Sequence, residues 1–146
     1  MKLFIKKTNP NALLPKRCSD QAAGYDLATC LEQPLTLKVG ETGKIPTGIS
    51  VQPEESDVAL LLYPRSSLAT KYGITFPNSV GVIDSDYRGE IFVAMTNSGS
   101  SDYTFTHNER IAQLIVTPII VPEIVETEVL TDTARGTGGF GSTGKI

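Results

Sequence analysis

The twelve residues from Arg135 to Ile146 hold the chemical groups that suit a phosphorylated ligand best. Five of them are glycines, and the others include an arginine, a phenylalanine, hydroxyl side chains and a lysine. Glycines leave the backbone free to wrap a ligand, and converging amides can hold phosphate oxygens. Arg135 offers a charged fork for those oxygens, and Phe140 offers a face on which a base can stack. The segment therefore predicts a lid over a nucleotide. A disordered glycine tail is the alternative that composition alone favours.

Two common nucleotide-binding motifs fit these glycines only in part. Gly136, Gly138 and Gly141 match a dinucleotide pattern that requires a following helix, but only five residues follow the third glycine. The segment 139–145 matches most of a P-loop, but Ile146 replaces the Ser or Thr that should come next. Neither motif is therefore adopted.

The segment 78–90 reads as strand, turn and strand, and it carries two aspartates, Asp84 and Asp86. The carboxylate of Asp84 can orient and deprotonate water. The amide of Asn78 can pair with a base edge, and the ring of Tyr87 can pack on a sugar. The spacing of the two acids superficially resembles a calcium loop, but Arg88 and Met95 occupy two of the ligand positions and exclude it. A solvated turn remains the alternative.

Three other segments carry polar groups that could belong to a binding site. Arg65, Ser66 and Ser67 stand where a strand turns into the only expected helix, whose first amides attract anions. An ordinary cap, with Arg65 in a surface ion pair, is the alternative. Asp26 follows a glycine at a strand start, which by itself indicates only a turn and a strand. Gln113 lies among apolar neighbours and needs a hydrogen-bond partner, either backbone or ligand.

The composition predicts one globular domain of 146 residues, with 40% hydrophobic and 20% charged residues. A net charge of −3 argues against stable nucleic-acid binding. No apolar run approaches the ~20 residues of a membrane span, and no signal peptide is visible. We therefore expect a location in the cytoplasm, the nucleus or a host-cell interior, without secretion. Cys18 and Cys30 are expected to be reduced thiols, and His107 a surface or turn histidine.

Short apolar runs separated by glycine and proline predict an all-β sandwich or barrel. The single helix is expected at Ser66–Tyr72, where a serine can cap the first turn and Gly73 can end the last. The segment after Pro122 is polar and extended with little apolar surface, so we expect it to run over a neighbouring subunit. The predicted strands are Leu3–Ile5, Leu35–Val39, Gly48–Val51, Val58–Tyr63, Ile91–Met95, Ile111–Thr117 and Ile119–Val125.

Taken in order, the segments around Asp26, Arg65, Asp84, Gln113 and Arg135 resemble the five motifs of the trimeric deoxyuridine triphosphatase (dUTPase) family. The resemblance implies one jelly-roll-like domain over residues 1–146, in which residues 125–146 form an extended arm and lid exchanged within a homotrimer. Each active site would draw on three subunits. The reaction would convert dUTP to dUMP and pyrophosphate with Mg²⁺ held mainly by the triphosphate, which limits uracil in DNA and supplies dUMP for dTTP synthesis.

The resemblance also implies a role for each motif residue. Asp84 would activate the water that attacks the α-phosphorus, and Asp26 would reach the metal through water. Tyr87 would stack under the deoxyribose and exclude a 2′-hydroxyl. Uracil would be held by Asn78, Gly81, Val82 and Ile83, and the phosphates by Arg65, Ser66, Ser67 and Gln113. The tail would contribute Arg135, Phe140, Gly141, Ser142 and Thr143. Ser67 departs from the family's glycine, so we expect altered phosphate contacts with function retained.

Three other functions fit parts of this sequence. A dCTP deaminase on the same fold would need a catalytic glutamate and a pocket for the cytosine amino group, whereas the intact hairpin favours uracil. A regulatory protein without catalysis would be favoured by the loss of Asp84 or the tail, and both are present. A generic β-sandwich binding module would leave the order of the five motifs to coincidence.

Overall fold

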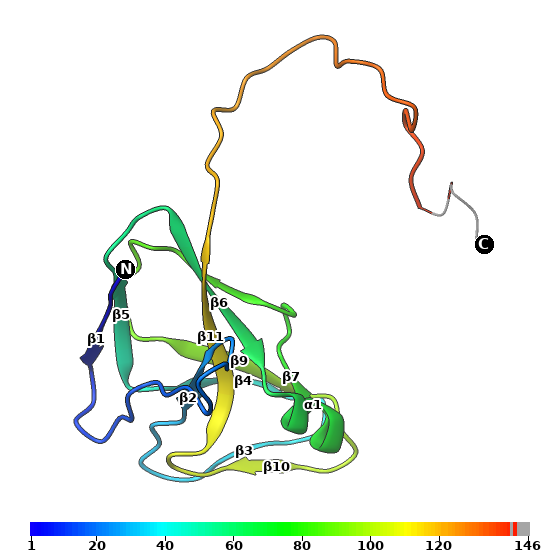
Figure 1. Cartoon of the computed structure of the whole chain (residues 1–146). Coiled ribbons are helices and arrows are strands. Elements are labelled where there is room, and N and C mark those ends of the chain that lie inside the picture. The colour runs from blue at the N-terminus through cyan, green and yellow to red at the C-terminus, as the bar shows by residue number, and fades with distance from the viewer. Residues whose placement is uncertain (141, 143–146) are drawn as a thin grey trace.

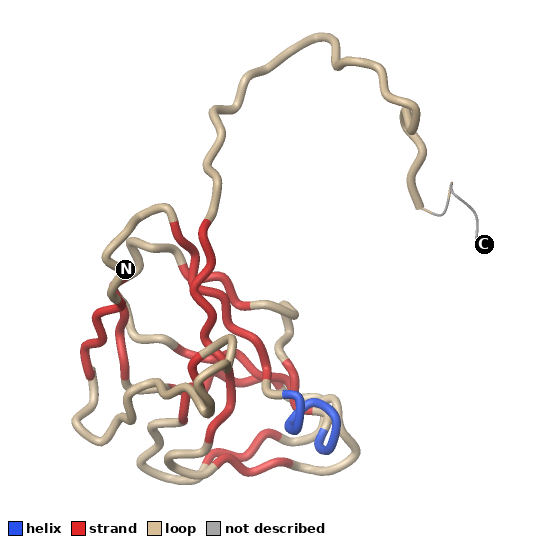
Figure 2. Tube along the Cα trace, in the orientation of Figure 1, coloured by secondary structure: helices blue, strands red, loops and turns tan. Residues whose placement is uncertain are grey.

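The computed structural model describes residues 1–140 and 142, and strands are the main regular structure of its body (Figures 1 and 2). The strands are β1 (Leu3–Lys7), β2 (Tyr25–Ala28), β3 (Leu35–Leu37), β4 (Thr42–Pro46), β5 (Ile49–Pro53), β6 (Val58–Pro64), β7 (Ile74–Thr75), β8 (Gly81–Ile83), β9 (Phe92–Asn97), β10 (Tyr103–Phe105) and β11 (Arg110–Pro118). The helix α1 spans Ser66–Tyr72. The all-β class with one short helix is therefore confirmed.

Antiparallel pairing arranges these strands in four groups. The largest sheet has the order β2-β11-β6-β8, and a second has the order β4-β9-β7. The pairs β1-β5 and β3-β10 complete the body. Apolar side chains from all four groups meet in one buried cluster. In Figure 2 the helix lies at one corner of the strands, next to the point where β6 ends.

Alternation of side chains along each strand explains how the sequence fills this core. In β6, Leu60 and Leu62 are buried, whereas Leu61 and Tyr63 are only partly covered. Side chains that point to opposite faces in turn produce this pattern. The apolar runs that predicted strands at 58–63 and 111–117 correspond to β6 and β11, which pair with each other along their length.

Several short strands were missed because their sequences carry little apolar signal. β4 reads Thr-Gly-Lys-Ile-Pro, and only Ile45 among these is fully buried. It forms because its backbone pairs with β9 over all five positions. β7 and β10 are only two and three residues long. Pairing with a distant partner, rather than local pattern, determines such strands.

The helix α1 has the expected span, Ser66–Tyr72, but a different N-cap. Its N-cap is Arg65, and no side chain caps the first turn, so the expected serine cap is wrong. Ser66 is the first residue of the helix, and its hydroxyl makes no capping hydrogen bond. The hydroxyl is therefore available to other partners. The end is as predicted, because Gly73 adopts φ +69°. A Cβ atom there would lie 2.5 Å from the Gly99 backbone, so this position accepts only glycine.

The strand predicted at Ile119–Val125 is wrong, because the chain leaves the body after β11 as an arm without regular structure. The Ile119 amide donates to the Asp57 carbonyl oxygen at 2.9 Å, and the arm's other described hydrogen bonds are internal. Pro118 and Pro122 cannot donate to a ladder, and no strand of the described body lies beside the arm (Figure 1).

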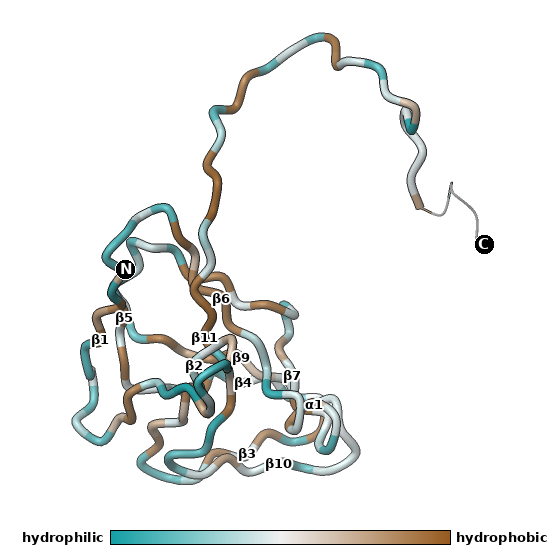
Figure 3. The backbone as a smooth tube through the Cα atoms, in the orientation of Figure 1, coloured by the Kyte–Doolittle hydropathy of each residue, from teal (hydrophilic) through white to brown (hydrophobic). Residues whose placement is uncertain are grey.

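The arm also carries more apolar surface than its acidic residues suggested, and Figure 3 shows hydrophobic stretches along it. Ile124 is 89% exposed and Leu130 is 81% exposed. Side chains of this size are usually covered in a stable protein. The expectation of little apolar surface is therefore wrong, while a covering partner becomes more necessary. The exposed aliphatic residues are Ile119, Ile120, Val121, Ile124, Val125, Val129 and Leu130.

The two cysteines do not pair, as expected for reduced thiols. Cys18 is exposed, whereas Cys30 is buried. Burial, followed by the nearby carboxylates of Glu90 and Glu32, raises the pKa of the Cys30 thiol above its ordinary value. His107 is exposed in a turn, as predicted, and its Nδ1 accepts a hydrogen bond from the Leu31 amide at 3.1 Å.

Iodoacetamide is expected to modify the native protein at Cys18 alone, because Cys30 is both buried and held as the unreactive thiol. Mass spectrometry of peptides from native and guanidinium-unfolded protein measures this difference. A Cys18→Ser variant should take up no label until it is unfolded. Rapid native labelling of Cys30 would contradict the prediction.

Candidate active site

The turn between β8 and β9 borders a cavity of about 320 Å³. Its walls come from β8 and the turn after it on one side and from β4 and β9 on the other. The hairpin predicted over 78–90 is wrong, because β8 pairs with β6, whereas β9 pairs with β4 and β7. The lining residues are Lys44, Val82, Ile83, Asp84, Tyr87, Glu90, Ile91, Phe92 and Ala94. The structure therefore brings the predicted catalytic residue Asp84 and the predicted sugar-stacking residue Tyr87 to one cavity.

A second cavity of about 180 Å³ shares part of this wall and is lined by the remaining residues that were predicted to hold a base. Asn78 and Gly81 line it together with Val82, Ile83 and Phe92. β8 is the last strand of its sheet, so one backbone edge of this strand has no partner in that sheet. Free backbone donors and acceptors beside a cavity can pair with the edge of a flat polar ring. All five predicted residues of the hairpin from Asn78 to Asp84 thus line one of the two cavities.

The carboxylate of Asp84 is exposed and makes no hydrogen bond or ion pair within residues 1–140. Its backbone oxygen accepts a bond from the Tyr87 amide at 3.1 Å, which closes the turn. Lys44 is likewise a charge on this cavity without an ion pair to a described residue. A proton acceptor with no competing partner is suited to act on a bound water.

Sequence reasoning missed Lys44 and Phe92 as part of this site. Lys44 pairs with Ala94 and Pro46 with Phe92 in the β4–β9 ladder, which brings the Lys44 and Phe92 side chains to the cavity beside the β8–β9 turn. Forty residues separate Lys44 from Asp84 in the chain, and no local motif connects them. Only the register of the β4–β9 ladder connects Lys44 with the Asp84 cavity, and this register cannot be read from the sequence before the sheet forms.

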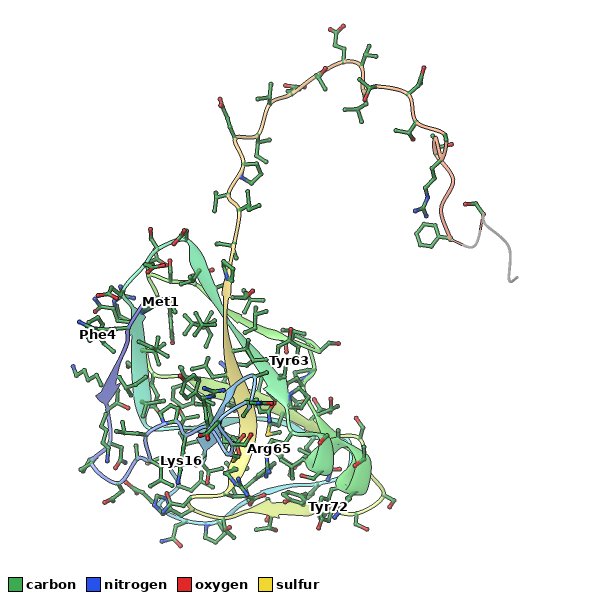
Figure 4. The ribbon with its side chains drawn as sticks, in the orientation of Figure 1. Met1, Phe4, Lys16, Tyr63, Arg65 and Tyr72 are labelled. Carbon is green, nitrogen blue, oxygen red and sulfur yellow. The ribbon has the colours of Figure 1, made fainter. Side chains whose placement is uncertain are left out.

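A second polar cluster lies where β2, β6 and β11 meet. Asp26 is 8% exposed, and its Oδ2 accepts a hydrogen bond from Arg110 Nη1 at 3.1 Å. Arg65 Nε lies 3.9 Å from the same oxygen, and Arg65 Nη1 donates to the Arg110 carbonyl oxygen at 3.2 Å. The thiol of Cys18 donates to that carboxylate oxygen at 3.1 Å. Figure 4 shows Arg65 near the end of β6 that leads into α1.

This cluster decides between the two readings of Arg65. The guanidinium forms an ion pair, as the alternative reading held, but its partner is the buried Asp26 rather than a surface carboxylate. Arg110, which sequence reasoning did not assign to the site, balances the same charge. Two arginines on one buried carboxylate fix the orientation of all three side chains.

The other phosphate-binding candidates lie beside this cluster with free side chains. Ser66 and Ser67 begin α1, and neither hydroxyl bonds to another described residue. Gln113 pairs with both Asp26 and Tyr63, but its side chain is exposed. The expectation that its apolar neighbours force it to find a partner is therefore wrong, because alternation along β11 turns it outward. Its amide remains available to a ligand.

The donor set around Asp26 is compatible with an indirect metal contact. The described residues contain no group of three or more His, Cys, Asp or Glu side chains that could hold an ion. All three contacts of Asp26 go to Oδ2. Oδ1 has no described partner, and since no buried side-chain oxygen lacks one, it is open to solvent. Mg²⁺ usually retains waters and binds through few carboxylates plus substrate phosphates, which fits this arrangement.

The two clusters lie at opposite ends of β6. Ile83 pairs with Leu60, so Asp84 comes next to Ala59, and Arg65 follows Ala59 by six residues. At about 3.3 Å per residue, this separation is about 20 Å. A single nucleotide cannot bring both clusters of one chain to the same phosphate group. The structure therefore gathers the predicted residues into two half-sites.

The tail residues lie apart from both half-sites (Figure 1). Arg135 Nε donates to the Gly138 carbonyl oxygen at 2.9 Å, so the guanidinium folds onto its own segment. Phe140 is fully exposed at φ +47°, and the Ser142 amide donates to the Gly139 carbonyl oxygen. Gly141 and Thr143 lie outside the described residues. No described contact places the tail on the rest of the chain.

Comparison with known proteins gives a consistent result. A family profile for dUTPase matches residues 10–144. The deoxyuridine 5′-triphosphate nucleotidohydrolase of Nautilia profundicola is 46% identical over 145 residues, which cover 99% of this chain and 100% of that protein. The corresponding protein of Desulfitobacterium hafniense is 46% identical over 131 residues, which cover 90% and 87%.

Solved structures give the same fold. The dUTPase of Staphylococcus bacteriophage 80alpha with dUPNHPP superimposes with a TM-score of 0.88 at 27% identity, over 98% of both chains. The jelly-roll-like β-sandwich that the motifs implied is thus confirmed. Within the described residues, no helix is long and apolar enough to span a membrane.

Proposed function

The chain belongs to the dUTPase family, hydrolases of a nucleoside triphosphate, and we propose that it converts dUTP to dUMP and pyrophosphate with Asp84 as the residue that activates water. One observation carries this assignment. The Asp84 carboxylate lines the cavity that also holds Tyr87, and it has no hydrogen-bond partner among the described residues. A free carboxylate can orient a water and accept its proton as the water attacks the α-phosphorus.

The smaller cavity would take the base. The unpaired backbone edge of β8 and the Asn78 amide offer hydrogen-bond donors and acceptors beside this cavity, which a uracil edge could use. A Cβ atom at Gly81 would lie 3.1 Å from the Leu62 side chain, so the strand packs closely on β6. A confined pocket rejects the thymine methyl through steric exclusion. Tyr87, on the larger cavity, would face the sugar.

The second half-site would hold the phosphates. Ser66 and Ser67 offer free hydroxyls at the start of α1, and Gln113 offers a free amide. The serine at position 67 adds a hydroxyl where the family has glycine. Mg²⁺ bound to the triphosphate would neutralise charge that develops at the phosphates. Oδ1 of Asp26 would receive a water of that ion, while Arg110 and Arg65 keep the carboxylate in place.

We infer that three copies of the chain complete each site. The ~20 Å between Asp84 and Arg65 supports a site in which the β8–β9 turn of one copy meets the phosphate half-site of another. The exposed aliphatic side chains of the arm require a covering surface, and a neighbouring copy supplies one. The arm would then deliver Arg135 and Phe140 to a site on a third copy. A symmetric homotrimer satisfies these conditions.

The activity would lie inside the cell, where it limits uracil in DNA and supplies dUMP for thymidylate synthesis. Product analysis with dUTP, dCTP, dTTP and UTP, each with Mg²⁺, tests the assignment. We expect dUMP and pyrophosphate from dUTP alone. Deamination of dCTP would show the sister activity instead, and binding of dUTP without turnover of any nucleotide would show a regulatory protein.

Phe140→Ala is expected to reduce kcat/KM for dUTP by about fivefold to 150-fold, since a stacked base is worth about 1–3 kcal/mol. The ring is fully exposed in the isolated chain, so its removal should leave the melting temperature unchanged. Steady-state kinetics and a thermal melt measure the two effects. Phe140→Tyr keeps the stacking face and serves as the matched control. Unaltered kinetics for Phe140→Ala would show that the ring does not cover the base.

A further inference from the structure

The ring of Tyr87 lies against the backbone of its own turn. Its hydroxyl donates a hydrogen bond to the Glu90 carbonyl oxygen at 3.0 Å. A Cβ atom at Gly89 would stand 2.3 Å from the phenol oxygen and 2.5 Å from the ring carbon that bears it. Gly89 does not have a positive φ, so the requirement for glycine here is one of space. The ring occupies the volume that any other side chain at position 89 would need.

The Glu90 carbonyl group, which holds the Tyr87 ring, is fixed in turn by the Glu90 side chain. Glu90 Oε1 accepts a bond from the Gly48 amide at 2.9 Å, and Oε2 accepts one from Thr8 Oγ1 at 3.0 Å. The amide of the next residue donates to the Ile49 carbonyl oxygen at 2.9 Å. Glu90 is thus clamped to two separate segments of the body, and the tether for Tyr87 cannot shift alone.

This arrangement determines which chemistry Tyr87 presents to the cavity. Because the phenol hydroxyl is engaged with Glu90, the ring offers a carbon surface to a sugar. A deoxyribose carbon can pack on that surface. A 2′-hydroxyl brought to the same place would lose its hydrogen bonds to water without gaining one to the protein. This cost lets a site reject a substrate with an added polar group. Sugar selectivity therefore depends on the plane in which the ring is held.

We propose that Gly89 and Glu90 are positioning residues that determine selectivity for deoxyribose over ribose by fixing the Tyr87 ring at the cavity wall. Gly89 provides the space under the ring, and Glu90 provides the clamped carbonyl group. Both act through Tyr87. The inference rests on the proposed function, since the ring faces a sugar only if the cavity binds the nucleotide.

The ratio of kcat/KM for dUTP to kcat/KM for UTP in the full-length protein tests this role. Gly89→Ala and Glu90→Ala are expected to lower the ratio about tenfold, since the displaced ring admits the 2′-hydroxyl. Glu90→Gln should keep the wild-type ratio. Its amide oxygen still accepts from Gly48, and its NH₂ group can donate to the Thr8 hydroxyl.

Two controls separate positioning from general destabilisation. Phe105→Leu alters a fully buried ring in β10, away from the β8–β9 turn. It should lower the melting temperature and leave the dUTP-to-UTP ratio of kcat/KM unchanged. Tyr87→Phe keeps the ring and removes only its tether, so its ratio should fall even if the Gly89 and Glu90 variants do not fold.

Three outcomes would overturn the proposal. The first is a ratio within about twofold of wild type in folded Gly89→Ala and Glu90→Ala. The second is an unchanged ratio in Tyr87→Phe. The third is a wild-type protein that does not hydrolyse dUTP, which would overturn the proposed function as well, whereas the first two leave that function intact.

Discussion

Asp84→Asn is expected to lower kcat for dUTP by about 10²–10⁴-fold, the range associated with loss of a general base. The amide keeps the size of the carboxylate but cannot take a proton from water. Since Asp84 forms no other described side-chain contact, the fold and the affinity for dUTP should be retained. Stopped-flow or steady-state assays give kcat, and calorimetry with a non-hydrolysable dUTP analogue gives the affinity.

Asp86→Asn is the matched control for this experiment. Asp86 is an exposed acid in the same turn, but it does not line the cavity. Its substitution changes the net charge of the turn equally and should leave kcat within about twofold of wild type. An Asp84→Asn protein with normal turnover would refute the assignment of the water-activating residue. Equal losses in both variants would indicate a general effect of charge in the turn.

Removal of residues 135–146 is expected to lower kcat/KM for dUTP by about 10²-fold or more while the body remains folded. The described tail residues bury no side chain in the core, so the melting temperature should not change. The loss would come from the charge of Arg135, the stacking face of Phe140 and the exclusion of water. Unfolding of the shortened chain would contradict the role of the tail as a lid.

Mixing this shortened chain with Asp84→Asn should restore activity that neither possesses. In a trimer whose hairpin and tail come from different copies, each mixed trimer contains one site with an intact Asp84 and an intact tail. Random assembly from equal amounts would then give about a quarter of wild-type activity. Subunits refolded together from denaturant provide the sample, and their activity is compared with that of separately refolded chains.

A shortened chain that also carries Asp84→Asn is the control, and its mixture with Asp84→Asn should remain inactive. Recovery in the first mixture alone requires that Asp84 and the tail act across subunits. No recovery, with mixed trimers shown by mass spectrometry, would mean that each chain closes its own site. That outcome would contradict the shared active site while leaving dUTP hydrolysis in place.

The sequence by itself determined the parts of this protein that are encoded over a few neighbouring residues. The strand and turn from Gly81 to Tyr87 are contiguous, and turn chemistry with short apolar runs predicted them, although the strand pairs with β6 and not with the strand that follows it. The same holds for α1, where Gly73 supplies the left-handed conformation that ends the helix. Short apolar runs bounded by turn residues also predicted β6 and β11, because a run of this length is a local property of a strand.

The tertiary structure decided how these pieces meet. Arg110 and Asp26 are 84 positions apart, and Lys44 reaches the Asp84 cavity only through the β4–β9 register. Gln113 looked buried among its sequence neighbours, yet alternation along β11 exposes it.

The arm after β11 also shows that local sequence does not determine which strands pair. Its aliphatic residues read as a strand at 119–125, but a strand requires a partner, and the described part of the chain places none beside it. Local pattern sets which side chains alternate, whereas the pairing of distant strands sets which of them face each other. Pairing depends on burial summed over the whole sheet, so it becomes visible only in the folded structure.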